Sequence, residues 1–116
     1  MAFTVQMVTF DCVDPSALAH WWATQFGGAV HPLMPDEYFV VTMAEGADLG
    51  FQKVDVPTPG KNRLHLDFHI DGDIDVEVAR LTAAGAHEVE RHAFGDQARW
   101  VVLRDPEGNV FCVAGG

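Results

Sequence analysis

Basic residues and cysteines are scarce in this 116-residue chain. Seven Lys and Arg residues stand against 17 Asp and Glu residues, and the formal net charge at pH 7 is -10. A surface with this charge repels the phosphates of nucleic acids and of anionic lipids, so neither a nucleic acid nor a membrane is expected as a partner. The two cysteines, Cys12 and Cys112, cannot make a disulfide framework, and no Cys-X-X-Cys or Cys/His spacing predicts a structural zinc site.

Long apolar segments are also missing from the sequence. No apolar run approaches the ~20 residues that a membrane-spanning helix needs. Residues 1–4 have neither the basic nor the apolar part of a secretory signal, so we expect a cytoplasmic protein. The chain length and a hydrophobic content of 48% suit a single domain, residues 1–116, with a core of its own.

One segment combines an apolar face with a chemically functional one. In residues 64–70 every second residue is apolar, and the residues between them are His65, Asp67 and His69. This alternation predicts a strand with one face against a helix and a polar opposite face. Side chains two residues apart on a strand are ~6.6 Å apart, so His65 and Asp67 can act on one ligand or ion. The alternative is that His65 is only a hydrogen-bonded histidine of a pocket wall.

The remaining segments form two similar series of elements. Asp14-Pro15 before an apolar stripe, and Gly27-Gly28 after it, are typical of the start and end of a helix. The prolines and glycine of residues 56–62 predict a linker between module one, residues 1–55, and module two, residues 63–116. We predict helices at 14–26 and 73–84, and strands at 3–13, 29–33, 38–43, 49–54, 64–70, 86–92, 99–103 and 109–114.

The two modules can be aligned by pattern. An offset of 58 residues sets Met7 on His65, and toward the module ends an offset of 60 sets Gln52 on Cys112. If the modules fold alike, each of these four residues lies on the polar face of its module. Cys112 is then either a small inert apolar residue or a reactive thiol.

Three stretches resemble a known superfamily. They are the unit from Asp14-Pro15 to Gly27-Gly28, the stretch Gly60 to Asp67, and the stretch Asp105 to Cys112. Together they resemble the vicinal oxygen chelate superfamily, which includes glyoxalase I, bleomycin resistance proteins and extradiol dioxygenases, and in particular its glyoxalase-like domain branch. The resemblance implies an α+β fold of two βαβββ modules, which form a curved mixed sheet cup with helices on the convex side. It also implies a homodimer.

The resemblance implies positions for a metal site. In metal-binding members each module supplies two ligands, one from its first strand and one from its last, and the matching residues here are Met7, Gln52, His65 and Cys112. His65 and, through its carbonyl, Gln52 suit a divalent metal, whereas Met7 and Cys112 depart from the usual pattern. The departure removes the carboxylate that a glyoxalase I reaction needs as a base, so that activity is not implied.

Three functions remain open. The first is a metal-free small-molecule binding protein, with Met7, Gln52, His65, Trp100 and Cys112 against the ligand. The second is a lyase or isomerase that uses a divalent metal or acid–base catalysis by His65 and Asp67. The third is an accessory dimer with an inactive cavity. Trp100 either stacks on a ligand or lies at a rim or an interface.

Overall fold

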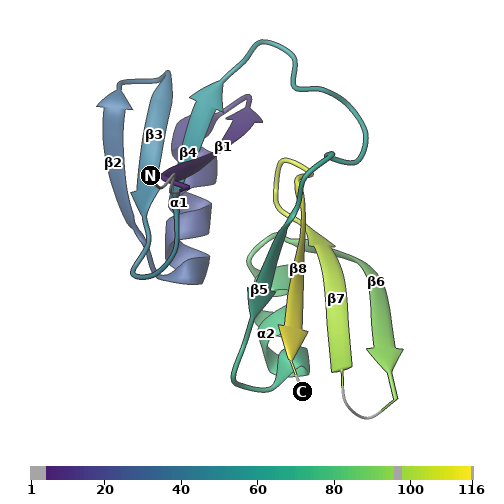
Figure 1. Ribbon diagram of the computed structural model, residues 1–116. Coiled ribbons are helices and arrows are strands. Elements are labelled where there is room, and N and C mark those ends of the chain that lie inside the picture. The colour runs from purple at the N-terminus through teal and green to yellow at the C-terminus, as the bar shows by residue number, and fades with distance from the viewer. Residues whose placement is uncertain (1–4, 96–97, 116) are drawn as a thin grey trace, which may run out of the picture. The chain divides into compact units, whose positions relative to one another are not determined.

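Each half of the chain folds into a four-stranded mixed sheet with one helix against it (Figure 1). The computed structural model describes residues 5–95 and 98–115. The chain divides into unit one, Met1–Pro57, and unit two, Thr58–Gly116. The division falls inside the predicted linker, and each unit contains one βαβββ series.

The two units repeat one order of elements. Unit one contains β1 (Met7–Cys12), α1 (Pro15–Phe26), β2 (Ala29–Met34), β3 (Tyr38–Thr42) and β4 (Asp48–Lys53). Unit two contains β5 (Leu66–His69), α2 (Ile74–Ala83), β6 (His87–Phe94), β7 (Ala98–Arg104) and β8 (Val110–Gly115). The α+β class and the two βαβββ modules are therefore confirmed. The joining of the modules into one cup stays a prediction.

The first and last strands of each unit are neighbours. The strand orders are β1-β4-β3-β2 and β5-β8-β7-β6. β1 pairs with β4 and β5 pairs with β8 in parallel, whereas the other neighbours are antiparallel. A parallel pair needs a crossover connection, and the helix supplies part of it in each unit.

Helix α1 has the predicted caps and the predicted apolar stripe. The Asp14 carboxylate accepts a hydrogen bond from Ala17 N at 3.1 Å, and Gly27 ends the helix with a φ of 79°. Glycine suits that left-handed position because it has no Cβ. Trp22 is fully buried and stacks on Phe26, whereas its neighbour Trp21 is half-buried at the edge of this cluster.

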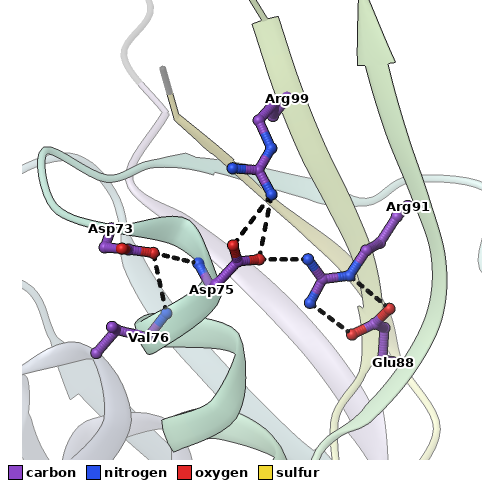
Figure 2. A network of polar contacts seen from close by, with 6 residues as sticks. All are labelled: Asp73, Asp75, Val76, Glu88, Arg91 and Arg99. Carbon is purple, nitrogen blue, oxygen red and sulfur yellow. Dashed lines mark hydrogen bonds and ion pairs between the residues drawn. The ribbon is translucent and has the colours of Figure 1, made fainter.

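Helix α2 is held to its sheet by apolar and by ionic contacts. Ile74, Val78 and Leu81 are at most 2% exposed. At the first turn the Asp75 carboxylate accepts hydrogen bonds from Arg91 of β6 and from Arg99 of β7, and Arg91 also binds Glu88 (Figure 2). The two arginine contacts lower the pKa of Asp75 below its usual value. These ion pairs join the first turn of α2 to two strands.

A buried carboxylate organises the turn between β7 and β8. Asp105 is 1% exposed, and its side chain accepts hydrogen bonds from Glu107 N, Asn109 N and Asn109 Nδ2 at 2.8–2.9 Å. The Asn62 side chain then pairs with Val110 through both its oxygen and its nitrogen. These contacts set the start of β8 and therefore the height of Cys112 in the sheet.

Several predicted boundaries are wrong by a few residues. β5 begins at Leu66, so His65 lies just before the strand and not within it. The strand predicted at residues 86–92 extends to Phe94, because Ala93 and Phe94 pair with Arg99 and Ala98. Residues 3 and 4 of the first predicted strand lie outside the described residues, as do residues 96 and 97 between the strands predicted at 86–92 and 99–103.

The lengths of the helices bear on membrane association. α1 has 12 residues and α2 has 10. Within residues 5–95 and 98–115, neither helix is long and apolar enough to cross a bilayer.

We expect Asp105→Ala to lower the free energy of unfolding by about 2–3 kcal/mol, because it leaves donors of the β7–β8 turn without their acceptor. Urea denaturation of the full chain measures this change. Glu107→Ala is the matched control, because it removes a neighbouring carboxylate whose side chain is exposed, and its effect should stay within about 0.5 kcal/mol. Equal losses in both variants would contradict the role of Asp105.

Candidate functional site

The polar side chains of unit two gather on the face of the sheet that points away from α2. Phe111 and Val113 are buried on the helix side, and Cys112 between them points to the other side. Cys112 is level with Asp67 on β5 and with Val102 on β7. The predicted alternation therefore holds over β5, whereas Leu64 of the predicted apolar face is 70% exposed. The register adds Cys112 to the polar face of β5.

Asp67 lies between a histidine and a thiol. Its Oδ1 is 3.0 Å from His65 Nδ1, and a carboxylate oxygen lies within 4.8 Å of the Cys112 sulfur. The His65 and Asp67 side chains are 39% and 66% exposed, whereas Cys112 is only 8% exposed. The structure thus brings together three of the residues that the sequence singled out, and it leaves the carboxylate accessible.

The Cys112 thiol is held in its neutral form. Burial, followed by the hydrogen bond and the negative charge of Asp67, raises the pKa of Cys112 to about 11. A thiolate is the reactive form of cysteine, and very little of it is present at neutral pH with such a pKa. The geometry favours the inert interpretation of Cys112 over the reactive one.

Apolar side chains border this polar group. Val102, Val110 and Cys112 form a buried cluster, and Trp100 packs against it. The Trp100 indole also stacks on the His92 imidazole, with ring centroids 4.9 Å apart. His92 in turn contacts Glu90 at 2.9 Å. Trp100 is therefore close to the predicted site, although β6 already supplies one partner for its ring.

Unit one has a different group at the corresponding place. Thr9 is the counterpart of Asp67, and its partner on β4 is Gly50. A Cβ on Gly50 would lie 2.7–2.8 Å from Tyr38 Oη, Met7 Sδ and Thr9 Oγ1. The Tyr38 hydroxyl donates to Met7 Sδ at 3.1 Å and lies 3.2 Å from Thr9 Oγ1. Neutral groups thus fill the space where unit two has Cys112.

The predicted alignment of Gln52 with Cys112 is wrong by two residues. Gly50, not Gln52, is the counterpart of Cys112, and Gln52 lies opposite Asp11. The error arises because β6 and β7, with eight and seven residues, form a longer hairpin than β2 and β3, with six and five. A slip of two residues keeps the same face of the strand, so alternation cannot detect it.

Met7 and Gln52 are not brought together within unit one. Met7 is level with Asp48 and Gln52 with Asp11, so the two side chains are four residues apart along the strands, ~13 Å by the rise per residue. Gln52 is exposed. Sequence reasoning missed Tyr38 and Gly50, and the available signal was that Tyr38 is the single tyrosine of the chain.

The two units differ in how well their side chains suit the divalent metal that the resemblance implies. Unit one offers a thioether and a glycine, which do not fit a divalent ion. Unit two does fit one, because ligand atoms of His65, Asp67 and Cys112 all lie within 4.8 Å of one another. Nitrogen, oxygen and sulfur ligands suit zinc, and two ligands of one tetrahedral zinc are ~4 Å apart at most. Small rotations of the exposed His65 and Asp67 side chains would bring the ligand atoms from 4.8 Å to the ~4 Å separation that one zinc ion requires.

Comparisons with known proteins agree with this architecture. A family model described as glyoxalase-like domain matches residues 7–114. A search of curated proteins found no match. Among solved structures, a glyoxalase/bleomycin resistance protein/dioxygenase family enzyme from Burkholderia phytofirmans has a TM-score of 0.84 at 20% identity, over 97% of this chain and 98% of that one.

Two further solved structures have more specific names. A fosfomycin resistance protein from Listeria monocytogenes has a TM-score of 0.81 at 15% identity, over 100% of this chain and 95% of that one. A lactoylglutathione lyase from Agrobacterium tumefaciens has a TM-score of 0.72 at 17% identity, over 100% and 96%. At these identities the likeness concerns the fold.

We expect Asp67→Asn to increase the rate at which iodoacetamide alkylates Cys112 at pH 8–9. The substitution removes the negative charge and the acceptor that help to raise the pKa of Cys112 to about 11, so the thiolate fraction rises. Mass spectrometry of the native protein measures the rate, in a Cys12→Ser background.

Asp71→Asn is the matched control for this experiment, because Asp71 also pairs with a histidine two residues before it, His69, and is fully exposed. A rate that changes equally in the two variants would argue against the link between Asp67 and Cys112.

Proposed function

The chain belongs to the glyoxalase-like domain family, and we propose that it binds a small polar molecule at His65, Asp67 and Cys112. The proposal places the ligand on the polar face of unit two and requires no metal ion. It is supported by the names of two neighbours of the same fold, which refer to the small molecules fosfomycin and lactoylglutathione.

The observation that carries the proposal is the orientation of the Asp67 carboxylate. The His65 imidazole holds it through a contact of 3.0 Å and the Cys112 thiol lies beside it, yet 66% of the side chain is exposed. A carboxylate oriented in this way can accept hydrogen bonds from a ligand hydroxyl, amine or amide without losing side-chain entropy on binding. His65 directs Nδ1 toward Asp67, so its Nε2 remains for a second contact with the ligand.

Apolar neighbours would complete the site. Val102, Val110 and Trp100 lie beside Cys112 and form an apolar border around the polar group. Mostly apolar walls with a few oriented polar groups are typical of small-molecule sites. We assign Trp100 as a ligand-contact residue on this basis, and Met7 and Gln52 keep only the support of the family resemblance.

A second candidate is a metal-dependent lyase or isomerase. It is favoured by one observation, the convergence of the three donors of His65, Asp67 and Cys112. A divalent ion bound there would polarise a substrate oxygen as a Lewis acid. In the metal-free form of this candidate, Asp67 orients the His65 ring, and His65 Nε2 exchanges the proton with the substrate.

We further propose that the protein acts in the cytoplasm as a homodimer. The support is the resemblance to superfamily members of this size, which pair their modules across a dimer. Light scattering coupled to size-exclusion chromatography measures the mass, and a monomer at micromolar concentration would contradict the dimer.

We expect a thermal-shift screen of small polar compounds, with fosfomycin and S-lactoylglutathione among the probes, to find at least one that raises the Tm of the full chain. Asp67→Ala should weaken its affinity by about tenfold or more, because a hydrogen bond to a charged group is lost. Asp71→Ala, which removes the equivalent carboxylate beside His69, should bind as the unaltered protein does. The proposal would be abandoned if no compound stabilises the protein, or if the two variants respond alike.

For the second candidate we expect about one cobalt or zinc ion per chain after loading and desalting. Mass spectrometry of metals measures the content, and the thiolate-to-cobalt charge-transfer absorption reports Cys112 as a ligand. Cys112→Ser should abolish the absorption, whereas Cys12→Ser should not. Retained metal without this absorption would reject the three-donor site.

A further inference from the structure

The helix-covered side of unit two contains a hollow that the site above does not use. It has a volume of about 170 Å³ and is lined by Arg91, His92, Ala93, Arg99, Trp100 and Val101. These residues come from the paired strands β6 and β7, where Ala93 is opposite Arg99 and Arg91 is opposite Val101. Cys112 is level with Val102 and points to the other face. The hollow is therefore separate from the His65–Asp67–Cys112 group.

Two arginines of the hollow converge on one carboxylate. Arg91 and Arg99 both donate to Asp75 in the first turn of α2 (Figure 2). The full sequence has only seven Lys and Arg residues. In a chain with a net charge of -10, Arg91 and Arg99 provide two guanidinium groups close together, to which a small anion can bind.

The two guanidinium groups differ in how many of their N–H donors already make hydrogen bonds. Arg91 uses Nε and Nη2 on Glu88 and Nη1 on Asp75. Among the described contacts, Arg99 uses Nη2 alone, at 3.1 and 3.2 Å from the two oxygens of Asp75. A guanidinium has five N–H donors, so the Nε and Nη1 donors of Arg99 remain for another acceptor. Its side chain is 41% exposed, which makes these donors accessible.

We propose that this hollow binds a small aromatic carboxylate, with its carboxylate on Arg99 and its ring against Ala93 and Val101, because the Trp100 and His92 rings point to the opposite face of the sheet. The volume suits one ring, because a cavity of about 150 Å³ accommodates benzene. Planar rings also pack well on guanidinium surfaces. A carboxylate binds an arginine through two neighbouring N–H donors, and both such edges of Arg99 include Nη2, so a bound anion shares Nη2 with Asp75.

The Asp75 carboxylate competes with a bound anion for the guanidinium group of Arg99. It occupies one edge of Arg99 and also joins α2 to the sheet, so a bound anion shares its cations. Loss of the Asp75 charge should therefore strengthen binding of the anion, although the first turn of α2 loses its ion pairs. The opposite responses of Asp75 and Arg99 variants distinguish a site from a merely structural ion pair.

The experiment is a ¹H–¹⁵N NMR titration of the full chain with benzoate, and benzamide is the neutral control. We expect saturable shifts at the amides of residues 91–93 and 99–101, and much weaker shifts with benzamide. Arg99→Gln should weaken benzoate binding by about tenfold. Asp75→Asn should strengthen it by at least threefold.

Arg80→Gln is the matched control, because Arg80 is an exposed arginine on α2 that pairs with Glu77. Its benzoate affinity should equal that of the unaltered protein. The proposal is overturned if there is no saturable shift, if benzamide binds equally well, or if Arg99→Gln behaves like Arg80→Gln. It is also overturned if Asp75→Asn weakens binding or if the shifts gather around His65, Asp67 and Cys112. The spectrum of each variant shows directly whether it is folded.

Discussion

The polar face of unit two depends on the parallel pairing of β5 with β8. Asp67 and Cys112 belong to the first and last strands of the unit, and only this pairing makes them level. The pairing in turn needs the α2 crossover and the turn in which the buried Asp105 carboxylate sets the start of β8. A local hydrogen-bond network therefore decides which side chain faces Asp67.

The chemistry of the site follows from the unequal burial of its members. Cys112 is buried and Asp67 is exposed, so the thiol remains neutral and donates to a charged acceptor. Such a pair presents a carboxylate and an imidazole to solvent and conceals the sulfur. A bound metal ion would instead favour the thiolate form of Cys112. Binding of a metal-free ligand and binding of a metal therefore require different protonation states of this thiol.

The two units show how one fold can hold different chemistry at equivalent positions. In unit two the first and last strands contribute Asp67 and Cys112, whereas in unit one the same places hold Thr9 and Gly50. Gly50 leaves room for Tyr38 and Met7, whose contact closes the space. The fold requires only that strands pair, and side chains on the polar faces are free to differ.

The sequence by itself determined the element types, the caps of α1, and the polar face of β5, because these depend on local periodicity and on capping chemistry. It did not determine the register of β4, since a slip of two residues preserves every face and Gln52 fits the pattern as well as Gly50. Only the tertiary structure decided that Cys112 meets Asp67, that Arg91 and Arg99 share Asp75, and that Tyr38 covers Gly50. Each of these contacts joins side chains of different elements, and the pairing of the strands and the packing of α2, which local periodicity does not determine, set their alignment.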